Sequence, residues 1–235
     1  LFRSLDAFTP EQAEAMMPDY TRELHAAQHR RIVDIALRNQ GRIPSWDVVN
    51  ESATDHQQGR LLPERGLCLS HYGPMPGDYA YRALKVADAV FPKSVALNIN
   101  DYNLGQCFVD QVQDLRARGC KIDIMGAQMH LFDPQQCLDI AAGVSDQQSP
   151  AQVWETMDRL QQCDLPIHLS EITITSPGGD QRGWDIQAVI ARNLYRLWFS
   201  IPRMMGITWW NVVDDCGAPG EPSVSGLFTR DMQAK

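Results

Sequence analysis

The sequence has few lysines, no block of basic residues and no long apolar run. Four of its 21 basic residues are lysines, the arginines are scattered, and the formal net charge is −8. Proteins that bind nucleic acid usually present a basic patch or stripe, so we expect no nucleic-acid partner. No run of about 18 apolar residues occurs, so we expect no membrane partner. With 44% hydrophobic and 21% charged residues, the composition is that of a globular domain.

Cysteine and histidine are present without the spacing of a metal site. Six cysteines are spread along the chain with no C-x-x-C pair: Cys68, Cys107, Cys120, Cys137, Cys163 and Cys216. This density is far below that of a disulfide scaffold, so we interpret them as small buried hydrophobic residues. His25 and His29 are four residues apart on a predicted helix, but "TRELHAAQHRR" lacks the acidic base and third ligand of a zinc hydrolase. We therefore expect no metal there.

The chain opens with "LFRSLDAFTP", which contains neither an initiator methionine nor a signal-peptide pattern. We therefore expect it to be processed or cut from a longer polypeptide. No G-x-G-x-x-G follows a strand and no P-loop occurs, so the usual signature of a nucleotide-binding fold is missing.

Hydrophobic periodicity predicts helices and strands in alternation. The predicted strands are 43–49, 95–101, 122–130, 166–172 and 206–212. The predicted helices are 10–39 (with a second start near Pro18), 78–91, 108–119, 150–163 and 184–199. Residues 52–77 are polar and rich in glycine and proline, which predicts a loop. Strands separated by helices, with no hairpin signal, indicate an α/β fold with parallel strands.

The predicted strands become polar where they end. The polar or aromatic ends are Asn50-Glu51, Asn100-Asp101, Gln128 with His130, Glu171, and Trp209-Trp210-Asn211. In a (β/α)₈ barrel all the C-terminal strand ends meet at one mouth, where active sites are built. Helix caps alone would not place glutamate directly on two strand ends, so we favour a functional site.

Two carboxylates at such a mouth suit the hydrolysis of a glycosidic bond. Of Glu51 and Glu171, one would donate a proton to the leaving oxygen while the other attacks the anomeric carbon, which requires different pKa values. The amide of Asn50 suits a sugar hydroxyl, His130 suits a carboxylate partner, and Trp210 suits a sugar face. Taken singly, His130 can also be a core histidine and Trp210 a packing residue.

The segments "WDVVNE", "NINDYNL", "GAQMHL", "HLSEITIT" and "GITWWNVVDD" occur in this order, and together they resemble glycoside hydrolase family 10. The founding activity of that family is endo-1,4-β-xylanase, and the likeness covers nearly the whole chain. The resemblance implies a (β/α)₈ TIM barrel of which residues 1–235 form about strands 4 to 8, as one partial catalytic domain without a second domain. Xylan or a xylo-oligosaccharide is then the expected substrate.

The resemblance also implies roles for single residues. Glu51 matches the general acid/base at the end of the fourth strand, and Asn50 matches the residue that binds the sugar 2-hydroxyl. Glu171, at the end of the seventh strand, matches the nucleophile of a retaining mechanism through a covalent glycosyl-enzyme. That chemistry needs no cofactor and no metal.

Four further residues match substrate-binding positions of the family. Gln128 and His130 match a Q-x-H motif on the sixth strand, whose histidine contacts the nucleophile. Tyr102 resembles a residue on the leaving-group side, and Trp210 matches the platform tryptophan of the eighth strand.

The sequence also departs from the family pattern. Ile172-Thr173 stands where the family usually has Leu-Asp, and Ala218 stands where a second aromatic residue is typical. The loop "DDCGAPGEPSVSG" therefore indicates a reshaped wall of the cleft. Two alternatives to a xylanase stay open: a non-catalytic carbohydrate-binding barrel remnant, and a retaining glycosidase that acts on another β-linked glycan.

The resemblance further implies segments that this sequence does not contain. The family barrel begins with three strands before the region matched here and ends with a further helix. We expect the missing N-terminal barrel segment in another chain, elsewhere in the protein, or beyond an inserted domain. Because polymeric xylan cannot cross a membrane, we expect an extracellular, periplasmic or cell-surface location.

Overall fold

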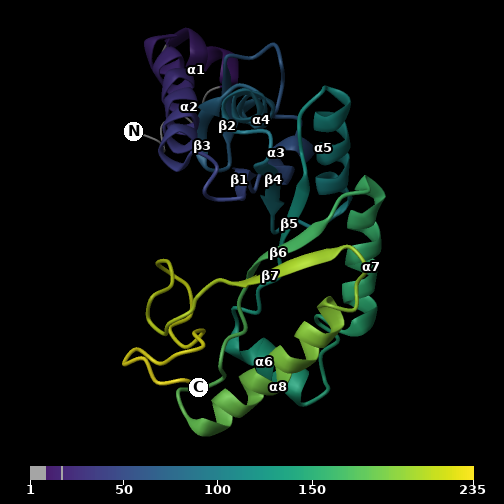
Figure 1. Cartoon of the computed structure of the whole chain (residues 1–235). Helices are drawn as coiled ribbons and strands as arrows, with labels where there is room; N and C mark the ends of the chain where they lie inside the picture. The colour runs from purple at the N-terminus through teal and green to yellow at the C-terminus, as the bar shows by residue number, and fades with distance from the viewer. Residues whose placement is uncertain (1–8, 17) are drawn as a thin grey trace. The chain divides into compact units, whose positions relative to one another are not determined.

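The computed structural model describes residues 9–16 and 18–235, which belong to two compact units (Figure 1). The first unit ends at Met125, and the second runs from Gly126 to Lys235. The opening residues 1–8, and residue 17 within the predicted helix 10–39, lie outside the described part. Among the described residues, no helix combines the length and the apolar character needed to cross a membrane.

Five strands form the main sheet, in the spatial order β1 (Ser45–Asn50), β4 (Ala96–Asp101), β5 (Ile124–Gln128), β6 (Ile167–Ile172) and β7 (Met204–Trp209). β1 pairs in parallel with β4, and β6 pairs in parallel with β7. The predicted α/β order with parallel strands is therefore confirmed, with each strand within three residues of its predicted bounds.

The predicted helical ranges are also helical in the structure. They correspond, within three residues at each end, to α1 (Pro10–Met16), α2 (Pro18–Asn39), α4 (Tyr79–Val90), α5 (Gln106–Ala117), α7 (Pro150–Leu160) with a 3₁₀ turn (Gln161–Cys163), and α8 (Gln181–Trp198). The second helix start near Pro18 is confirmed, because α2 begins there.

Side-chain caps explain where several helices begin. Before α1, the backbone N–H of Thr9 donates to Gln12 Oε1 at 2.9 Å, and the N–H of Gln12 donates to Thr9 Oγ1 at 3.3 Å. This reciprocal pair satisfies two N–H groups that the first turn leaves without helical partners. Before α7, Ser149 Oγ accepts from Gln152 N at 3.3 Å, and Pro150 occupies the first helical position.

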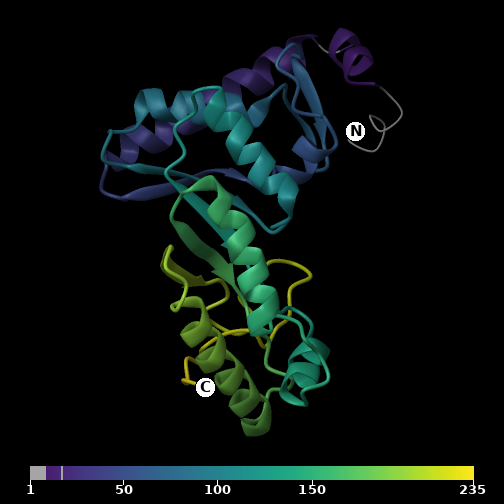
Figure 2. The same ribbon diagram turned by 90° about the vertical axis from the view of Figure 1, so that its right-hand side faces the viewer.

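In the first unit, α2 and α4 lie side by side and share an apolar core with the strands (Figure 2). The buried members of this core are Ala36, Ala87, Phe91, Val95 and Leu97. Partly buried side chains of α2 and β1, such as Ile32, Ile35, Trp46 and Val48, pack against them. The helical spacing on α2 and the apolar character of β1 thus serve the same core.

The prediction of a loop without a hairpin over residues 52–77 is wrong in part. This region contains a short helix, α3 (Ala53–Gln57), and an antiparallel hairpin of β2 (Leu67–Ser70) and β3 (Gly73–Pro76). The hairpin strands are four residues long, and the sequence "GPMP" carries no alternation typical of a strand. Contacts made by a distant residue, Asp55, hold the hairpin in place.

The carboxylate of Asp55 is completely buried at the centre of this region. It accepts hydrogen bonds from Ser70 Oγ at 2.5 Å, Tyr79 Oη at 2.9 Å, Arg60 Nη1 at 3.1 Å and His71 N at 3.2 Å. Burial raises the pKa of Asp55, but the hydrogen bonds from Ser70, Tyr79 and His71 outweigh it, so the pKa lies below its usual value. One carboxylate thereby joins α3, the hairpin and α4.

The second unit contains a helix that the sequence analysis did not predict, α6 (Pro134–Ala141). Its cap is Asp133, whose Oδ1 accepts from Gln135 N at 2.8 Å, and Pro134 occupies the first turn. The helix has only eight residues, too few for periodicity to reveal it. α6 and α8 lie side by side (Figures 1 and 2).

We expect Asp55→Ala to lower the free energy of unfolding by about 3 kcal/mol, because it leaves the donors Ser70 Oγ, Tyr79 Oη and His71 N without their acceptor. The pKa of Asp55 is lowered in the folded state, so its stabilising effect is present above its unfolded pKa and is lost as pH falls through the folded pKa. Urea unfolding at neutral and acidic pH measures both effects. The exposed pair of Asp19 with Arg22, at 2.9 Å, provides the control: Asp19→Ala should cost less than about 0.5 kcal/mol. Equal losses in the two variants would contradict this role of Asp55.

Candidate active site

In the first unit, the strand end at Asn50 and Glu51 is held by β4. Glu51 N donates to Asn100 O at 2.8 Å, which continues the β1–β4 ladder one residue beyond the strand. Asn100 Nδ2 donates to Asn50 Oδ1 at 2.8 Å. Glu51 has a φ of +56°, a left-handed conformation that non-glycine residues adopt rarely and at a cost. The candidate acid/base is thus placed in a strained but well-anchored position.

Asp101 joins this strand end to the turn that follows it. Its buried carboxylate accepts from Ala53 N and from Asn103 N, each at 2.8 Å. Burial is the main reason why the pKa of Asp101 is raised; the hydrogen bonds lower it, and the charge of Glu51 raises it further. Gln111, from α5, donates to Ser52 Oγ at 2.7 Å. Asp101 therefore connects the end of β4 to the backbone of α3, just after Glu51. The sequence alone did not predict this structural role.

Tyr102 follows Asp101 in the sequence, and 51% of its surface is exposed. An exposed phenol beside the candidate acid/base can meet a bound sugar, as the sequence analysis expected. Trp46, in contrast, lies on the core side of β1 against Phe91, with ring centroids 6.0 Å apart. Trp46 thus packs in the core near the start of β1, whereas Tyr102 lies just beyond the end of β4.

In the second unit, the structure brings His130 to Glu171. His130 Nε2 lies 3.5 Å from Glu171 Oε2, and both side chains are mostly buried. His130 Nδ1 lies 3.0 Å from Thr173 Oγ1, and its ring stacks on Phe132 with a centroid distance of 4.3 Å. The imidazole is therefore fixed on both sides while one nitrogen faces the candidate nucleophile.

Thr173 is a site residue that the sequence analysis noted only as a departure from the family. Its side chain is buried and holds His130. Gln128 is the buried last residue of β5, and the neighbouring Met129 N donates to Glu171 O at 2.9 Å. The predicted Q-x-H segment and the predicted nucleophile therefore lie on adjacent backbones.

The two tryptophans at the end of β7 have different environments. Trp209 is buried, and its Nε1 donates to Asn211 O at 3.0 Å and to Ser225 O at 3.1 Å. Trp210 exposes 45% of its surface, and its backbone N–H donates to Ile172 O at 2.8 Å. Trp209 is a packing residue, while Trp210 offers a ring face next to the strand end that carries Glu171.

A residue that the sequence analysis missed, Glu221, binds the indole of Trp210. Trp210 Nε1 donates to Glu221 Oε1 at 3.1 Å, and Glu221 Oε2 accepts from Asn211 Nδ2 at 2.8 Å and Ala218 N at 3.1 Å. Burial raises the pKa of Glu221, but the hydrogen bonds from Asn211, Ala218 and Trp210, with the charge of His130, lower it overall. No motif marks Glu221, because its contacts depend on how the loop folds.

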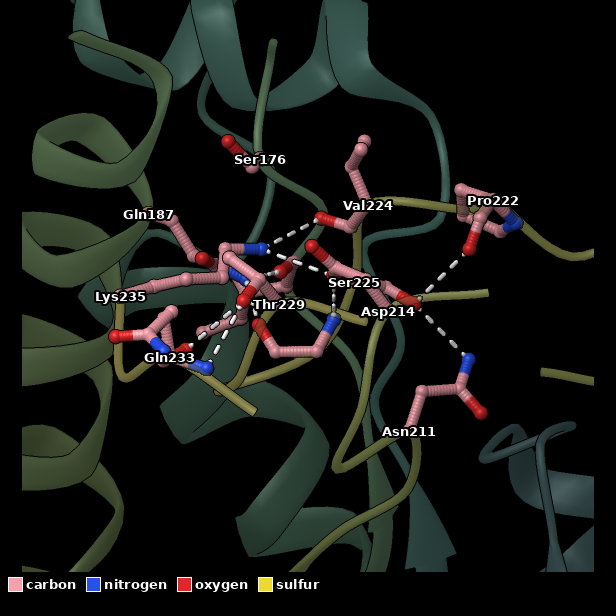
Figure 3. A network of polar contacts seen from close by, with 12 residues as sticks. Ser176, Gln187, Asn211, Asp214, Pro222, Val224, Ser225, Thr229, Gln233 and Lys235 are labelled. Carbon is pink, nitrogen blue, oxygen red and sulfur yellow. Dashed lines mark hydrogen bonds and ion pairs between the residues drawn. The ribbon is translucent and has the colours of Figure 1, made fainter. Parts of the chain in front are cut away.

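The loop that carries Glu221 is anchored by the polar network of Figure 3. The carboxylate oxygen Asp214 Oδ1 accepts from Gly226 N at 2.8 Å and lies 3.1 Å from Lys235 Nζ, which also donates to Val224 O at 3.2 Å. A Cβ at position 226 would lie 2.4 Å from Asp214 N, so glycine is required there. Gln187, from α8, donates to Ile174 O and Gly226 O. The loop is thus tied to both a helix and the end of the chain.

Metal binding has no support in the described residues. Within 9–16 and 18–235, no group of three or more His, Cys, Asp or Glu side chains is arranged to hold an ion. His25 lies next to Gly66 O, with its Nε2 2.5 Å from that oxygen.

All six cysteines are free thiols. Four of them are buried as predicted, whereas Cys107 is partly exposed and Cys216 is exposed.

Comparison with known proteins establishes the family. The family model described as Glycosyl hydrolase family 10 matches residues 9–235. The chain therefore belongs to glycosyl hydrolase family 10. Endo-1,4-beta-xylanase A of Thermoanaerobacterium saccharolyticum is 28% identical over 205 residues, which are 84% of this chain but 16% of that protein.

Solved structures support the fold. Xylanase B from Clostridium stercorarium F9 matches with a TM-score of 0.68 at 19% identity, over 98% of this chain and 68% of that chain. TsXylA, an intracellular xylanase from Thermoanaerobacterium saccharolyticum solved as a mutant with xylotetraose, matches with a TM-score of 0.64 at 22% identity, over 88% and 62%. The predicted fold class, a (β/α)₈ barrel of which this chain covers a part, is confirmed.

We expect Glu51→Gly to be more stable than Glu51→Ala by about 1 kcal/mol, because glycine adopts the left-handed conformation without the cost that a Cβ brings. Both variants lose the carboxylate, so their difference isolates the backbone. Thermal unfolding of the two proteins measures it. At the exposed residue Glu64, which is not among the residues with positive φ, glycine should be no better than alanine. A Glu51→Ala protein as stable as Glu51→Gly would contradict the assigned strain.

Proposed function

We propose that the protein containing this chain is a retaining endo-1,4-β-xylanase. The observation that carries the proposal is the placement of the Glu171 carboxylate against the fixed ring of His130, 3.5 Å away, beside the exposed indole of Trp210. Membership of glycosyl hydrolase family 10 supports a glycoside hydrolase. The matched relatives named as xylanases support xylan as the substrate.

In the proposed mechanism, Glu171 attacks the anomeric carbon and Glu51 donates its proton to the leaving oxygen. The glycosidic C–O bond breaks, and a covalent ester between the sugar and Glu171 forms. Glu51, now ionised, then takes a proton from a water molecule whose oxygen attacks the anomeric carbon on the face that the leaving group left, and the ester bond to Glu171 breaks. Two inversions give net retention, for which carboxyl groups about 5–5.5 Å apart are typical.

The remaining predicted residues take binding roles in this proposal. Asn50 hydrogen-bonds the sugar 2-hydroxyl, where a contact that strengthens in the transition state accelerates the reaction. His130 keeps Glu171 oriented, Gln128 lies beside them, Tyr102 meets the leaving-group sugar, and Trp210 forms the platform. No metal or organic cofactor takes part in these steps.

A second candidate is a retaining glycosidase that acts on another β-linked glycan. The observation that favours it is the loop over residues 214–226, in which Ala218 stands where the family typically has a second aromatic residue and donates its N–H to Glu221. A changed wall alters the contacts that select the sugar without altering the two glutamates. Product analysis on several β-linked glycans separates the two candidates.

The location of the protein and the remaining barrel strands also belong to this proposal. A polymeric substrate favours an extracellular, periplasmic or cell-surface location. The matched TsXylA, in contrast, is described as intracellular. We propose that a further barrel segment, in the same protein or in another chain, completes the site. Cell fractionation with an antibody against the whole protein measures both location and full length.

The test is reducing-end release from soluble arabinoxylan by the full-length protein and by its Glu171→Gln and Glu51→Gln variants. We expect the rate of each variant to fall by about 10²–10⁴-fold, because each variant lacks a group that acts in bond cleavage. The newly formed reducing end should first appear as the β-anomer by NMR.

The matched control is Glu155→Gln, because Glu155 lies on the exposed face of α7 with 74% of its side chain accessible. This variant should keep the activity of the parent. Full activity in Glu171→Gln would refute the assigned nucleophile. Xylan binding by a folded parent that releases nothing would instead indicate a carbohydrate-binding protein without catalysis.

A further inference from the structure

The hydrogen bond between Trp210 and Glu221 links an exposed aromatic ring to a partly buried carboxylate. The ring belongs to the candidate platform, whereas the carboxylate belongs to the loop that departs from the family. The indole nitrogen donates to Glu221 Oε1 at 3.1 Å. A bond from a neutral N–H to a charged acceptor is stronger than one between neutral groups, so it restrains the ring effectively.

The other carboxylate oxygen is held by the protein itself. Glu221 Oε2 accepts from the buried amide of Asn211 at 2.8 Å and from the backbone of Ala218 at 3.1 Å. Asn211 Nδ2 also donates to Ser225 Oγ at 3.1 Å. The acceptor that faces Trp210 therefore cannot turn away without breaking two further hydrogen bonds.

The loop has local features that this arrangement requires. A Cβ at Gly217 would lie 2.8 Å from Glu221 Oε2 and 3.1 Å from Asn211 Nδ2, so a side chain there would displace the carboxylate. Gly220, directly before Glu221, has a φ of +95°, which favours glycine. The contact of Asp214 with Lys235 then anchors the base of the loop (Figure 3).

Electrostatics connect Glu221 with the candidate nucleophile. The charge of His130 is among the causes that lower the pKa of Glu221, and the same ring lies 3.5 Å from Glu171. One imidazole therefore acts on both glutamates: it lies against the carboxylate of Glu171, and its charge lowers the pKa of Glu221. Ionised Glu221 persists to lower pH than an ordinary glutamate, so its bond to the indole persists as well.

We propose that Glu221 is the positioning residue of the sugar platform, holding the indole of Trp210 in the orientation in which its face meets the sugar. This inference rests on the proposed function, because it assumes that Trp210 binds the sugar. The orientation matters because apolar contact with a ring face depends on its angle. A ring that is already fixed loses little freedom when the sugar binds, so more of the contact energy appears as affinity.

The first test is spectroscopic and needs no activity. In ¹⁵N-labelled full-length protein, the indole N–H resonance of Trp210, assigned through Trp210→Phe, should move with pH as Glu221 titrates. Its midpoint should lie below the ordinary pKa of glutamate. The movement should disappear in Glu221→Ala. A Trp210 resonance that titrates identically in parent and Glu221→Ala would overturn the proposal.

The second test is kinetic. Glu221→Ala should raise KM on xylo-oligosaccharide about fivefold, the change that a net hydrogen-bond contribution of about 1 kcal/mol gives. Its kcat should stay within about twofold, because a platform contributes equally to substrate and transition-state binding. A merely structural role would instead reduce the active fraction, which lowers the apparent kcat and leaves KM unchanged.

The double variant identifies the path of the effect. Trp210→Phe keeps a ring face but removes the indole N–H, so adding Glu221→Ala to it should change KM less than about twofold. Glu155→Ala, on the exposed face of α7, is the matched control and should change neither constant. An equal KM effect of Glu221→Ala in both backgrounds would overturn the proposal, as would no effect in either.

Failure of the proposed function is distinguishable from failure of this inference. A parent that cleaves no xylan would refute the proposed function, while the indole titration would still decide whether Glu221 holds Trp210.

Discussion

Backbone hydrogen bonds that continue beyond the parallel strands are the constraint on which the candidate site depends. Glu51 N binds the carbonyl of Asn100 at 2.8 Å, and Trp210 N binds the carbonyl of Ile172 at 2.8 Å. Met129 N does the same with the carbonyl of Glu171 at 2.9 Å. Each of these hydrogen bonds restrains a candidate site residue, or its neighbour in sequence, at or just after the end of a strand. These hydrogen bonds restrict the backbone at these positions and so help to place the side chains that it carries.

Around this backbone, the chain controls carboxylates by controlling the N–H and O–H groups that reach them. Asp55 is buried, but its donors keep its pKa below the usual value. Asp101 is also buried, yet desolvation outweighs its donors and its pKa is raised. Glu221 is less buried, and its donors with the charge of His130 lower its pKa. Burial, the hydrogen-bond donors and the neighbouring charges together decide the direction in each case.

Much of the fold could be predicted from the sequence, because the strands and the long helices have a clear hydrophobic periodicity. β1, for example, was expected over 43–49 and lies at Ser45–Asn50. The β2–β3 hairpin was missed because its strands are short and are held by Asp55, which is remote in sequence. α6 was missed because it has eight residues and depends on a single cap.

The candidate site follows the same division. Glu51, Glu171 and His130 could be predicted as site residues from the sequence, because they lie within motifs at the ends of predicted strands. The contacts of Glu221 with Trp210 and of Thr173 with His130 could not be predicted, because they depend on how the chain folds. A loop contact of this kind depends on turns and glycine positions that no residue pattern specifies.

The most direct test of the central claim, that Glu171 is the nucleophile, is to trap the glycosyl-enzyme. A xyloside with fluorine at C2 and a dinitrophenolate leaving group should react with the full-length protein, release dinitrophenolate and leave the sugar bound as an ester. We predict that peptide mass spectrometry finds the added mass on Glu171. The label on Glu51 or on another carboxylate, in a protein that hydrolyses xylan, would contradict the account.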